Sequence, residues 1–392
     1  MPRFACLLAA VLCVAACSPQ KSPAPRAQAV APGSAAGQQY PSTFGTLVVN
    51  ELATGLEYPW ALAFLPDGRM LVTEKPGRLL LLGADGTFVA AIAGLPKIFV
   101  EGQSGLLDVA LSPDFAREPW VYLSLAEPNL RGNLAGTAVA RGRLVEHALR
   151  DVEVIYRQEP KLSSGTHVGS RLVFDDAGRL FVTQGENNKR ETAQELDKLQ
   201  GKLVRLDADG SVPADNPFVG RDGVRPEIWS YGHRNMQGAA LHPVTRQLWT
   251  TEHGPMGGDE INIPQAGKNY GWPIITWGIN YSGLPIPEAE GTAKKGMEQP
   301  HHYWPVSPAL SGMAFYVADR IPAWKHSLFL GALAQTSLIR LELDGDAIVG
   351  EERLLTGRNE RIRDVRVGPD GRLYVLTDAA NGKLLRVDLV AQ

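Results

Sequence analysis

The sequence predicts an all-β fold, a six-bladed β-propeller of four-stranded antiparallel blades. Two observations lead to this prediction: one strand–turn–strand pattern occurs six times along the 392 residues, and no helical crossover separates the copies. The composition agrees, because 41 glycines and 28 prolines suit a fold with many tight turns. Length alone favours two or three domains, and a two-domain β-sandwich is the alternative to the propeller.

The first copy shows the pattern clearly. Apolar residues 61–64 are followed by the turn Pro66-Asp67-Gly68 and by a second apolar segment, residues 70–73. Such a turn supplies glycine or aspartate where a positive φ or local capping is needed. The other copies pair residues 109–111 with 121–124, 171–174 with 180–183, 238–241 with 247–250, 313–316 with 327–330, and 365–367 with 373–376. Third strands are expected at residues 78–82, 202–206 and 383–387.

The N-terminal segment predicts export. Arg3 and the small apolar run that follows it indicate a signal peptide, residues 1–16, which is too short to span a membrane. The run ends in Val14-Ala15-Ala16-Cys17, which resembles a bacterial lipobox and predicts a lipid anchor on Cys17. An ordinary secretory signal cut near Ala16 is the alternative.

These features give the expected location and domain boundaries. Ser18 stands where an aspartate would retain a lipoprotein at the inner membrane. We therefore expect a protein of the bacterial cell envelope, anchored to the outer membrane and facing the periplasm. Residues 17–44 are rich in Ser, Pro, Ala, Gly and Gln and predict a flexible tether, and residues 45–392 form the propeller domain.

Charge and cysteine content narrow the partners. The formal net charge is −3 and there is no Lys/Arg-rich run, so nucleic acid is not expected as a partner. Contact with a membrane is expected only through the anchor. Cys6 and Cys13 lie in the signal peptide, so the mature chain would keep one cysteine and no internal disulfide is expected.

Polar residues gather in glycine-rich loops, where a rigid ring would carry a site. One loop is Gly165-Thr166-His167-Val168-Gly169-Ser170, whose imidazole could act as a base near neutral pH or could simply be a satisfied turn histidine. Another, residues 231–238, places the guanidinium of Arg234 beside the amide of Asn235. That pair could hydrogen-bond a carbonyl or quinone oxygen, or could join two loops.

Two further segments suggest ion binding. Residues 251–262 combine glycine-freed backbone carbonyls with acidic side chains, which suits Ca²⁺, and the rigid aromatic turn 267–273 follows. Neither matches an EF-hand or a zinc pattern. In Arg361-Ile362-Arg363-Asp364 the two arginines share one strand face. Two adjacent cations with one acid nearby could receive a polyanion, although a solvated run of charges is the ordinary reading.

In their order these motifs resemble the soluble aldose sugar dehydrogenases and, more distantly, the soluble glucose dehydrogenases that use pyrroloquinoline quinone (PQQ). The resemblance runs from about residue 48 to the C-terminus. The matching motifs are Glu101-Gly102-Gln103-Ser104-Gly105-Leu106-Leu107, the His167 loop, residues 201–206 with 213–217, Gly232-His233-Arg234-Asn235, Glu252-His253-Gly254-Pro255 with Gly257-Gly258-Asp259-Glu260, Gly267-Lys268-Asn269-Tyr270-Gly271-Trp272-Pro273, and Arg361-Ile362-Arg363-Asp364.

The resemblance implies a PQQ site on the propeller axis. His167 matches the general base and is also expected to be among the residues that contact the cofactor, and Glu186 stands where an aspartate usually orients that base. The remaining matches are grouped by role: Gln103, Arg234 and Asn235 around the quinone edge, with Arg234 stabilising charge, and Arg361 and Arg363 on the PQQ carboxylates.

The resemblance also implies two calcium ions. Gly254 and Pro255 match backbone-carbonyl ligands of a calcium that acts as a Lewis acid on the quinone. The Glu260 side chain and the Tyr270 backbone match a second, structural calcium. One departure stands out: Ala334 follows Gly331-Ala332-Leu333, where family members carry a lysine that reaches the cofactor.

The implied function is a PQQ- and calcium-dependent oxidoreductase that oxidises aldose sugars at the anomeric carbon to lactones and passes electrons to an unidentified acceptor. Two alternatives remain. If Ala334 reflects lost cofactor binding, the ring is a non-catalytic binding module. A calcium-dependent lactonase-type hydrolase is the other, but it would need carboxylates around an accessible metal and has no use for Arg361 and Arg363.

Overall fold

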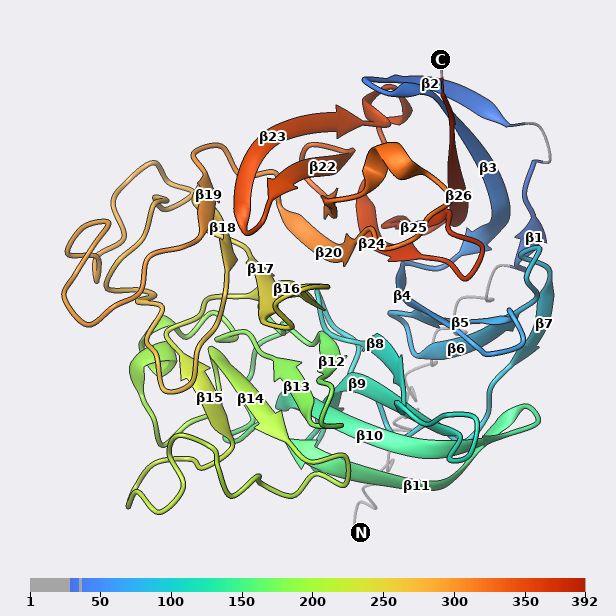
Figure 1. The fold of residues 1–392 in the computed structure, drawn as a ribbon. Coiled ribbons are helices and arrows are strands. Elements are labelled where there is room, and N and C mark those ends of the chain that lie inside the picture. Colours follow the sequence, from blue (N-terminus) through green and yellow to red (C-terminus); the bar gives the residue numbers. More distant parts are fainter. Residues whose placement is uncertain (1–28, 35–36, 392) are drawn as a thin grey trace, which may run out of the picture.

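The computed structural model describes residues 29–34 and 37–391. Six antiparallel sheets form a ring of blades, each built on four strands (Figure 1). The predicted all-β class and the six-bladed propeller are therefore confirmed.

The first five blades each use four consecutive strands. The first comprises β4 (Pro59–Phe64), β5 (Met70–Glu74), β6 (Arg78–Leu82) and β7 (Phe88–Ala91), and the second β8 (Leu106–Leu111), β9 (Trp120–Pro128), β10 (Ala135–Val145) and β11 (Ala148–Arg157). The third comprises β12 (Leu172–Phe174), β13 (Leu180–Thr183), β14 (Lys202–Leu206) and β15 (Ile228–Tyr231). The fourth comprises β16 (Met236–Leu241), β17 (Leu248–Glu252), β18 (Asp259–Asn262) and β19 (His302–Trp304), and the fifth β20 (Leu310–Phe315), β21 (Ser327–Ala332), β22 (Ser337–Asp344) and β23 (Ala347–Leu354).

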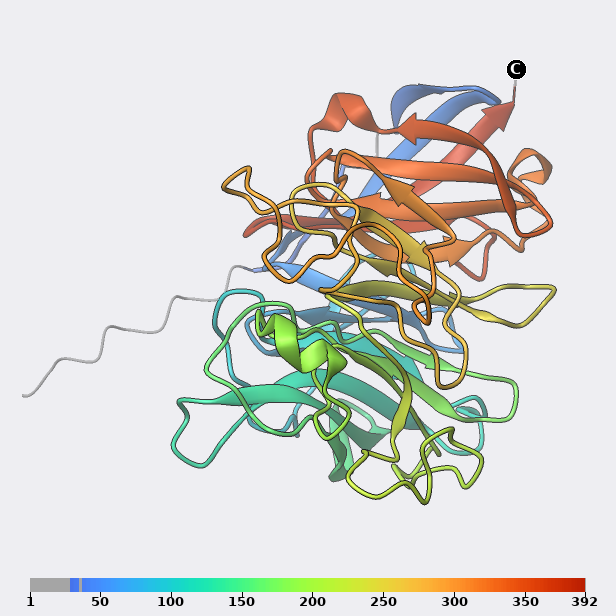
Figure 2. The same ribbon diagram turned by 90° about the vertical axis from the view of Figure 1, so that its left-hand side faces the viewer.

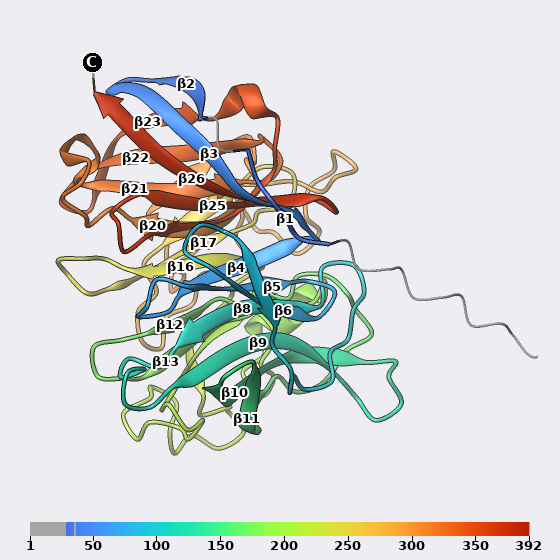
Figure 3. The ribbon, with the colours of Figure 1, turned by 90° about the vertical axis from the view of Figure 1, so that its right-hand side faces the viewer.

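The sixth blade closes the ring with strands from both ends of the chain. Its strands are β24 (Ile362–Val367), β25 (Leu373–Thr377), β26 (Gly382–Ala391) and the N-terminal β3 (Gly45–Leu56). Figure 3 shows β3 beside β26, which it pairs from Gly45 opposite Ala391 to Leu56 opposite Gly382. The short strands β1 (Ala31–Pro32) and β2 (Gln38–Ser42) also pair with β3, so strand pairing begins within the segment expected to be a tether.

The repeated sequence pattern corresponds to the first two strands of each blade. Residues 61–64 lie in β4 and residues 70–73 in β5, joined by the expected turn, in which Gly68 has a φ of 86°. The third strands expected at residues 78–82 and 202–206 coincide with β6 and β14. Helical structure in the described residues is limited to the 3-10 turns η1 (Arg190–Gln194), η2 (Pro322–Trp324) and η3 (Thr356–Arg358). The long connection between β18 and β19 projects from one side of the ring (Figures 1 and 2).

Side-chain hydroxyls join neighbouring blades. Near the end of β5, Thr73 donates to the carbonyl of Leu107, where the second blade begins. The same link recurs around the ring. It joins Ser124 to Ser170 O at 2.6 Å, Thr183 to Met236 O at 3.1 Å, Thr251 to Ser311 O at 2.9 Å, and Ser311 to Ile362 O at 2.7 Å. Four of these bonds start from second strands, at Thr73, Ser124, Thr183 and Thr251, and the bond of Ser311 starts from β20, the first strand of the fifth blade. They fix neighbouring blades relative to each other.

A buried ion network ties three blades together close to the axis. Arg171, just before β12, places Nη1 2.9 Å from Asp108 Oδ1 and 3.2 Å from Asp364 Oδ1. Arg366 contacts the same two carboxylates at 3.1 and 2.9 Å. The side chains of Arg171, Asp108 and Asp364 are each 1% exposed. Because the desolvation of such buried charges offsets much of their attraction, the network fixes the relative positions of the blades more than it adds to the free energy of unfolding. It fixes β24, the strand that carries Arg363.

The described residues contain no helix with the length and apolar character needed to cross a bilayer.

Candidate active site

All six blades contribute to one pocket of about 220 Å³, which therefore lies on the propeller axis. Its lining residues come from segments spread over the whole chain. They are Trp60 and Lys75 from the first blade, Gln103 from the second, Val168 from the third, Gln237 and His253 from the fourth, Ala309 and Leu333 from the fifth, and Arg361, Arg363 and Asp378 from the sixth. We call this the axial pocket.

One wall of the axial pocket is cationic. Arg361 and Arg363 both contact Asp378 Oδ2, with nitrogen–oxygen distances of 3.1 and 3.2 Å. Burial would raise the pKa of Asp378, but the charges of Arg363 and Arg361 outweigh it and lower that pKa below its usual value. The two arginines share one strand face as expected. The neighbouring Asp364 does not form an ion pair with these two arginines, because it belongs to the buried ion network.

The pocket has more donors than acceptors. Arg363 Nη1 donates a hydrogen bond to Gln237 Oε1 at 2.9 Å, yet the buried Nε of Arg363 has no hydrogen-bond partner. Lys75 adds a third positive charge, so three cations face the single carboxylate of Asp378. Trp60, Val168 and Leu333 supply apolar wall. A flat anion with several carboxylates fits such a set of groups.

A histidine–carboxylate pair lies at the edge of this pocket. His167 Nδ1 lies 2.7 Å from Glu186 Oε2, and the Glu186 carboxylate is fully buried. The same oxygen accepts from the backbone N–H of Asn188 at 2.7 Å. Among the described residues nothing hydrogen-bonds the His167 Nε2, so a proton on Nδ1 leaves Nε2 as the acceptor.

The backbone explains how the pair is brought together. His167 has a φ of 48°, the left-handed region that side chains rarely adopt. At Gly185 a Cβ would lie 1.9 Å from the His167 carbonyl oxygen, so only glycine permits the two loops to approach. This approach places Glu186, the next residue, within hydrogen-bonding distance of the imidazole. The longer glutamate still reaches the ring where an aspartate was the usual residue.

Gln103 connects the base to the pocket. Its Oε1 accepts from the backbone N–H of His167 at 2.8 Å, and its own backbone N–H donates to Gly165 O at 2.6 Å. Gln103 lines the axial pocket, and Val168, the residue after His167, also lines it. The sequence motif that contains Gln103 and the His167 loop therefore form one unit.

Arg234 and Asn235 lie behind the fourth-blade side of the pocket. Arg234 Nη1 donates to His253 O at 3.1 Å, and Asn235 Oδ1 accepts from Gly169 N at 3.1 Å. Both also join loops, the alternative raised by the sequence. Each keeps a buried donor without a partner, Arg234 Nε and Asn235 Nδ2. They therefore retain capacity to bind an oxygen atom.

His253 is uncharged in this setting. Burial lowers its pKa to about 4; the charge of Asp259 acts against this shift, and the charges of Arg234 and Arg363 act in the same direction as burial. Its Nε2 makes a short contact with Leu310 O. A neutral imidazole leaves the cationic character of the pocket to Lys75 and the arginines.

The buried loop with Gly254 and Pro255 leaves backbone oxygens without hydrogen-bond donors. Gly254 N donates to Asp259 Oδ1 at 2.9 Å, while the carbonyls of Gly254 and Pro255 accept no hydrogen bond within the described part of the chain. A Cβ on Gly254 would lie 2.2 Å from Gly257 O and 2.4 Å from Gly258 O, so this tight loop requires glycine. Unpaired carbonyls are suitable ligands for a hard cation.

Glu260 and Tyr270 belong to a buried cluster beneath this loop. Glu260 pairs across the strands with Glu252, whose carboxylate contacts His233 Nδ1 at 2.9 Å, and His233 stacks on Tyr270 at 4.9 Å. Burial and the charge of Glu252 raise the pKa of Glu260 to about 8. Across residues 29–34 and 37–391, no three His, Cys, Asp or Glu side chains are gathered as metal ligands. Most of the expected calcium ligands, however, are backbone carbonyls.

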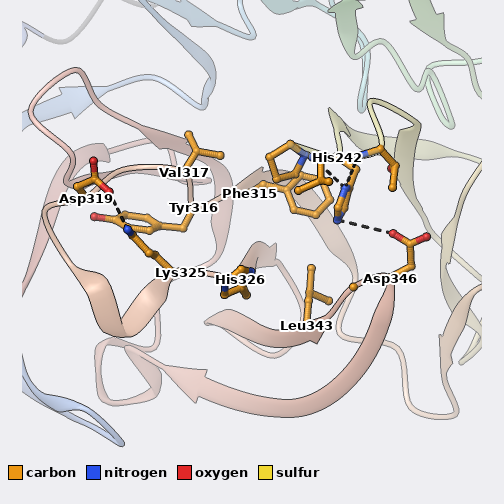
Figure 4. A pocket seen from close by; sticks show the side chains of 13 residues that line it. His242, Phe315, Tyr316, Val317, Asp319, Lys325, His326, Leu343 and Asp346 are labelled. Carbon is orange, nitrogen blue, oxygen red and sulfur yellow. Dashed lines mark hydrogen bonds and ion pairs between the residues drawn. The ribbon is translucent and has the colours of Figure 1, made fainter.

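A second pocket, of about 520 Å³, opens between the fourth and fifth blades (Figure 4). Apolar residues such as Phe315 and Leu343 line it. It also contains a contact between His242 Nε2 and Asp346 Oδ1 at 3.7 Å and an ion pair between Lys325 and Asp319 at 2.8 Å. His242 follows the end of β16 opposite to Asn235. This pocket is therefore separate from the axial site.

The structure thus brings the expected residues to one end of the ring, but only Gln103, Arg361 and Arg363 line the axial pocket itself. Sequence reasoning missed Lys75 and Asp378. Both stand just after a second strand, following Thr73-Glu74 and Thr377. The recurrence of a hydroxyl residue at that place was the available signal.

Comparison with known proteins places the chain among sugar dehydrogenases. A family model described as Glucose / Sorbosone dehydrogenase matches residues 56–386. The aldose sugar dehydrogenase YliI of Escherichia coli is 54% identical over 345 residues, 87% of this chain and 93% of that protein. A crystal structure of a glucose dehydrogenase has a TM-score of 0.86 at 61% identity, over 87% of this chain and 99% of that one. The PQQ-bound aldose sugar dehydrogenase of Streptomyces coelicolor has a TM-score of 0.73 at 28% identity, over 89% of this chain and 100% of that one.

Proposed function

Because the chain belongs to the Glucose / Sorbosone dehydrogenase family, an oxidoreductase family, we propose that it oxidises aldose sugars at the anomeric carbon to lactones, with PQQ and calcium as cofactors. One observation carries the proposal: the His167–Glu186 pair lies at the edge of a cationic pocket on the axis. The S. coelicolor relative, described as PQQ-bound, supports the choice of cofactor.

The axial pocket suits PQQ, which has three carboxylates. Arg361 and Arg363 would hold carboxylate groups, and the unpaired Nε of Arg363 supplies a buried donor for one of them. Gln103, Arg234 and Asn235 would lie toward the quinone edge, since the last two keep unpaired donors. When bound, PQQ supplies the hydride acceptor for the sugar.

His167 would remove the second hydrogen as a proton. With Nδ1–H donated to Glu186, the Nε2 lone pair is directed away from the carboxylate and can accept the proton of the anomeric hydroxyl. The buried Glu186 then stabilises the imidazolium that results, and its bond to Asn188 N holds it in place. An unidentified electron acceptor would afterwards reoxidise the enzyme.

Calcium would be held at two places. The free carbonyls of Gly254 and Pro255 would ligate one ion, which acts as a Lewis acid when bound. Glu260 and the backbone of Tyr270 would hold the other, in the cluster where burial and the charge of Glu252 raise the pKa of Glu260.

Reconstitution tests the proposal directly. Purified protein is incubated with PQQ and Ca²⁺, and the PQQ absorption spectrum and the oxidation of glucose with an artificial electron acceptor are recorded. Bound PQQ with oxidation to the lactone supports the proposal. A chain that binds no PQQ would instead be a binding module, and lactone hydrolysis without PQQ would favour the hydrolase.

Calcium binding at Glu260 should depend on pH. Folding raises the pKa of Glu260 from its ordinary 4.5 to about 8. The protonated form of this carboxyl therefore favours the folded state. That contribution is complete below pH 4.5 and is lost as the pH rises toward 8. Bound Ca²⁺ would offset the charge, so we expect the calcium-induced increase in Tm to be larger at pH 8.5 than at pH 5.5.

The matched variant is Glu260→Gln, which resembles the protonated carboxyl. Its Tm in EDTA should change less between pH 5.5 and 8.5 than that of the wild type, and its response to Ca²⁺ should shrink. Differential scanning fluorimetry measures both. An equal calcium response in the two proteins would contradict a metal site at Glu260.

We also propose the expected export and domain arrangement: signal peptide 1–16, a lipid anchor on Cys17, a connecting segment 17–44 whose later part pairs with the propeller through β1 and β2, and dehydrogenase domain 45–392. Residues 1–28 lie outside the described part of the chain. An anchor with more than one acyl chain on Cys17 would hold the protein stably at a membrane. The native protein should therefore remain in the membrane fraction, and Cys17→Ser should release it. Mass spectrometry of the native N-terminus decides the matter, because an unmodified terminus excludes the anchor.

A further inference from the structure

We propose that Lys75 is a third cation for a PQQ carboxylate and takes the place of the lysine that is absent at Ala334. The inference rests on the proposed function, because it assigns a residue to the same cofactor. It concerns a residue that no sequence motif singled out.

The position of Lys75 is fixed by its backbone. Its N–H donates to Tyr58 O at 3.1 Å, and its carbonyl accepts from Leu106 N at 3.0 Å. From this point, just after β5, the side chain reaches the axial pocket, where it lies with Arg361 and Arg363.

The ammonium group has donors to spare. Nζ donates to Gly102 O at 2.9 Å and lies 4.7 Å from the centre of the Tyr58 ring. No carboxylate among the described residues forms an ion pair with it, and an ammonium group has three donors. Since Asp378 Oδ2 is already shared by Arg361 and Arg363, the pocket holds a surplus of two positive charges.

This surplus has an electrostatic cost that an anion would relieve. Burial lowers the pKa of Lys75, and the like charges of Arg363 and Arg361 act in the same direction, while Asp378 acts against them. A bound carboxylate would therefore interact favourably with all three cations.

Position 334 faces elsewhere. Ala334 lines a neighbouring groove with Pro255, Met256 and Trp277, and it is Leu333 that lines the axial pocket. A lysine at 334 would approach from the fifth blade, whereas Lys75 approaches from the first. The cation is thus supplied from a different blade.

Lys75 also touches the loop next to the base. Gly102 precedes Gln103, and Gln103 Oε1 accepts from His167 N at 2.8 Å. Loss of Lys75 could therefore weaken PQQ binding by loosening this loop alone. The experiment must separate a charge effect from a positioning effect.

The test is a titration of the calcium-loaded, PQQ-free protein with PQQ, followed by quenching of tryptophan fluorescence, because Trp60 lines the pocket. Wild type, Lys75→Met and Lys75→Arg are compared at low and high salt. Lys325→Met is the control, since Lys325 pairs with Asp319 in the separate pocket of Figure 4.

We expect Lys75→Met to raise the Kd for PQQ by about tenfold to a hundredfold at low salt, with a smaller effect at high salt. Lys75→Arg keeps the charge and should stay near the wild type, as should Lys325→Met. If wild type binds PQQ and Lys75→Met binds it equally well, the inference fails while the proposed function stands. An equal loss at both salt concentrations would show a positioning role only and would also overturn it. A wild type that does not bind PQQ overturns the proposed function and this inference together.

Discussion

Replacement of His167 by alanine is expected to lower the turnover of the reconstituted enzyme by about 10²–10⁴, the usual contribution of general acid–base catalysis. The geometry gives the reason: His167 Nδ1 is held 2.7 Å from Glu186, which leaves Nε2 to take a proton. The affinity for PQQ should change little, because the imidazole does not line the axial pocket and the cations that do are untouched.

Steady-state kinetics and a PQQ titration on the same preparation test this expectation. Glu186→Gln is the companion variant, since it keeps the shape of the side chain but removes the charge that stabilises an imidazolium. It should also reduce turnover and spare PQQ binding. Near-normal turnover in His167→Ala would exclude His167 as the base.

The sequence was sufficient for the fold because its signal is local and repeated. Each blade begins with an apolar strand, a tight turn and a second apolar strand, so residues such as 61–64 and 70–73 could be paired without knowledge of the rest. The closure of the ring was not visible in this way. β3 and β26 pair although more than three hundred residues separate them, and the sequence of neither strand indicates which strand it pairs with.

The site was predictable in part for the same reason. Arg361 and Arg363 share a face by strand alternation, and the structure places both on Asp378. The adjacent Asp364 was the obvious acid, but the same alternation turns it to the other face, where it contacts Arg171.

The position of Lys75 in the axial pocket could not be predicted from the sequence alone. Neither it nor Asp378 lies in a polar motif, and their relation to Arg363 exists only because six blades meet at one axis. The interblade hydroxyl bonds indicate a better rule for this fold. Residues just after the second strand of a blade, such as Lys75 and His253, lie at the axial end and should be read together.

The arginines should contribute unequally to PQQ binding, and Arg363 should contribute more. The side chain of Arg363 is 12% exposed and that of Arg361 48%, so Arg363 meets an anion with little screening by solvent. Loss of one partner from a buried, hydrogen-bonded charge pair is costly. We therefore expect Arg363→Met to raise the Kd for PQQ by about 10²–10³.

Arg361→Met is the matched control, on the same strand face and with the same carboxylate partner. Its effect should be about tenfold or less, because exposed ion pairs contribute little, and it should shrink at high salt while the Arg363 effect persists. The Tm of the PQQ-free Arg363→Met protein separates binding from folding. Burial lowers the pKa of Arg363 and its ion pair with Asp378 raises it, so a Tm close to that of the wild type would show that the loss of affinity comes from the lost contact with PQQ and not from lost folding. Equal losses of affinity in the two variants would mean that PQQ contacts the exposed end of the pocket rather than its buried wall.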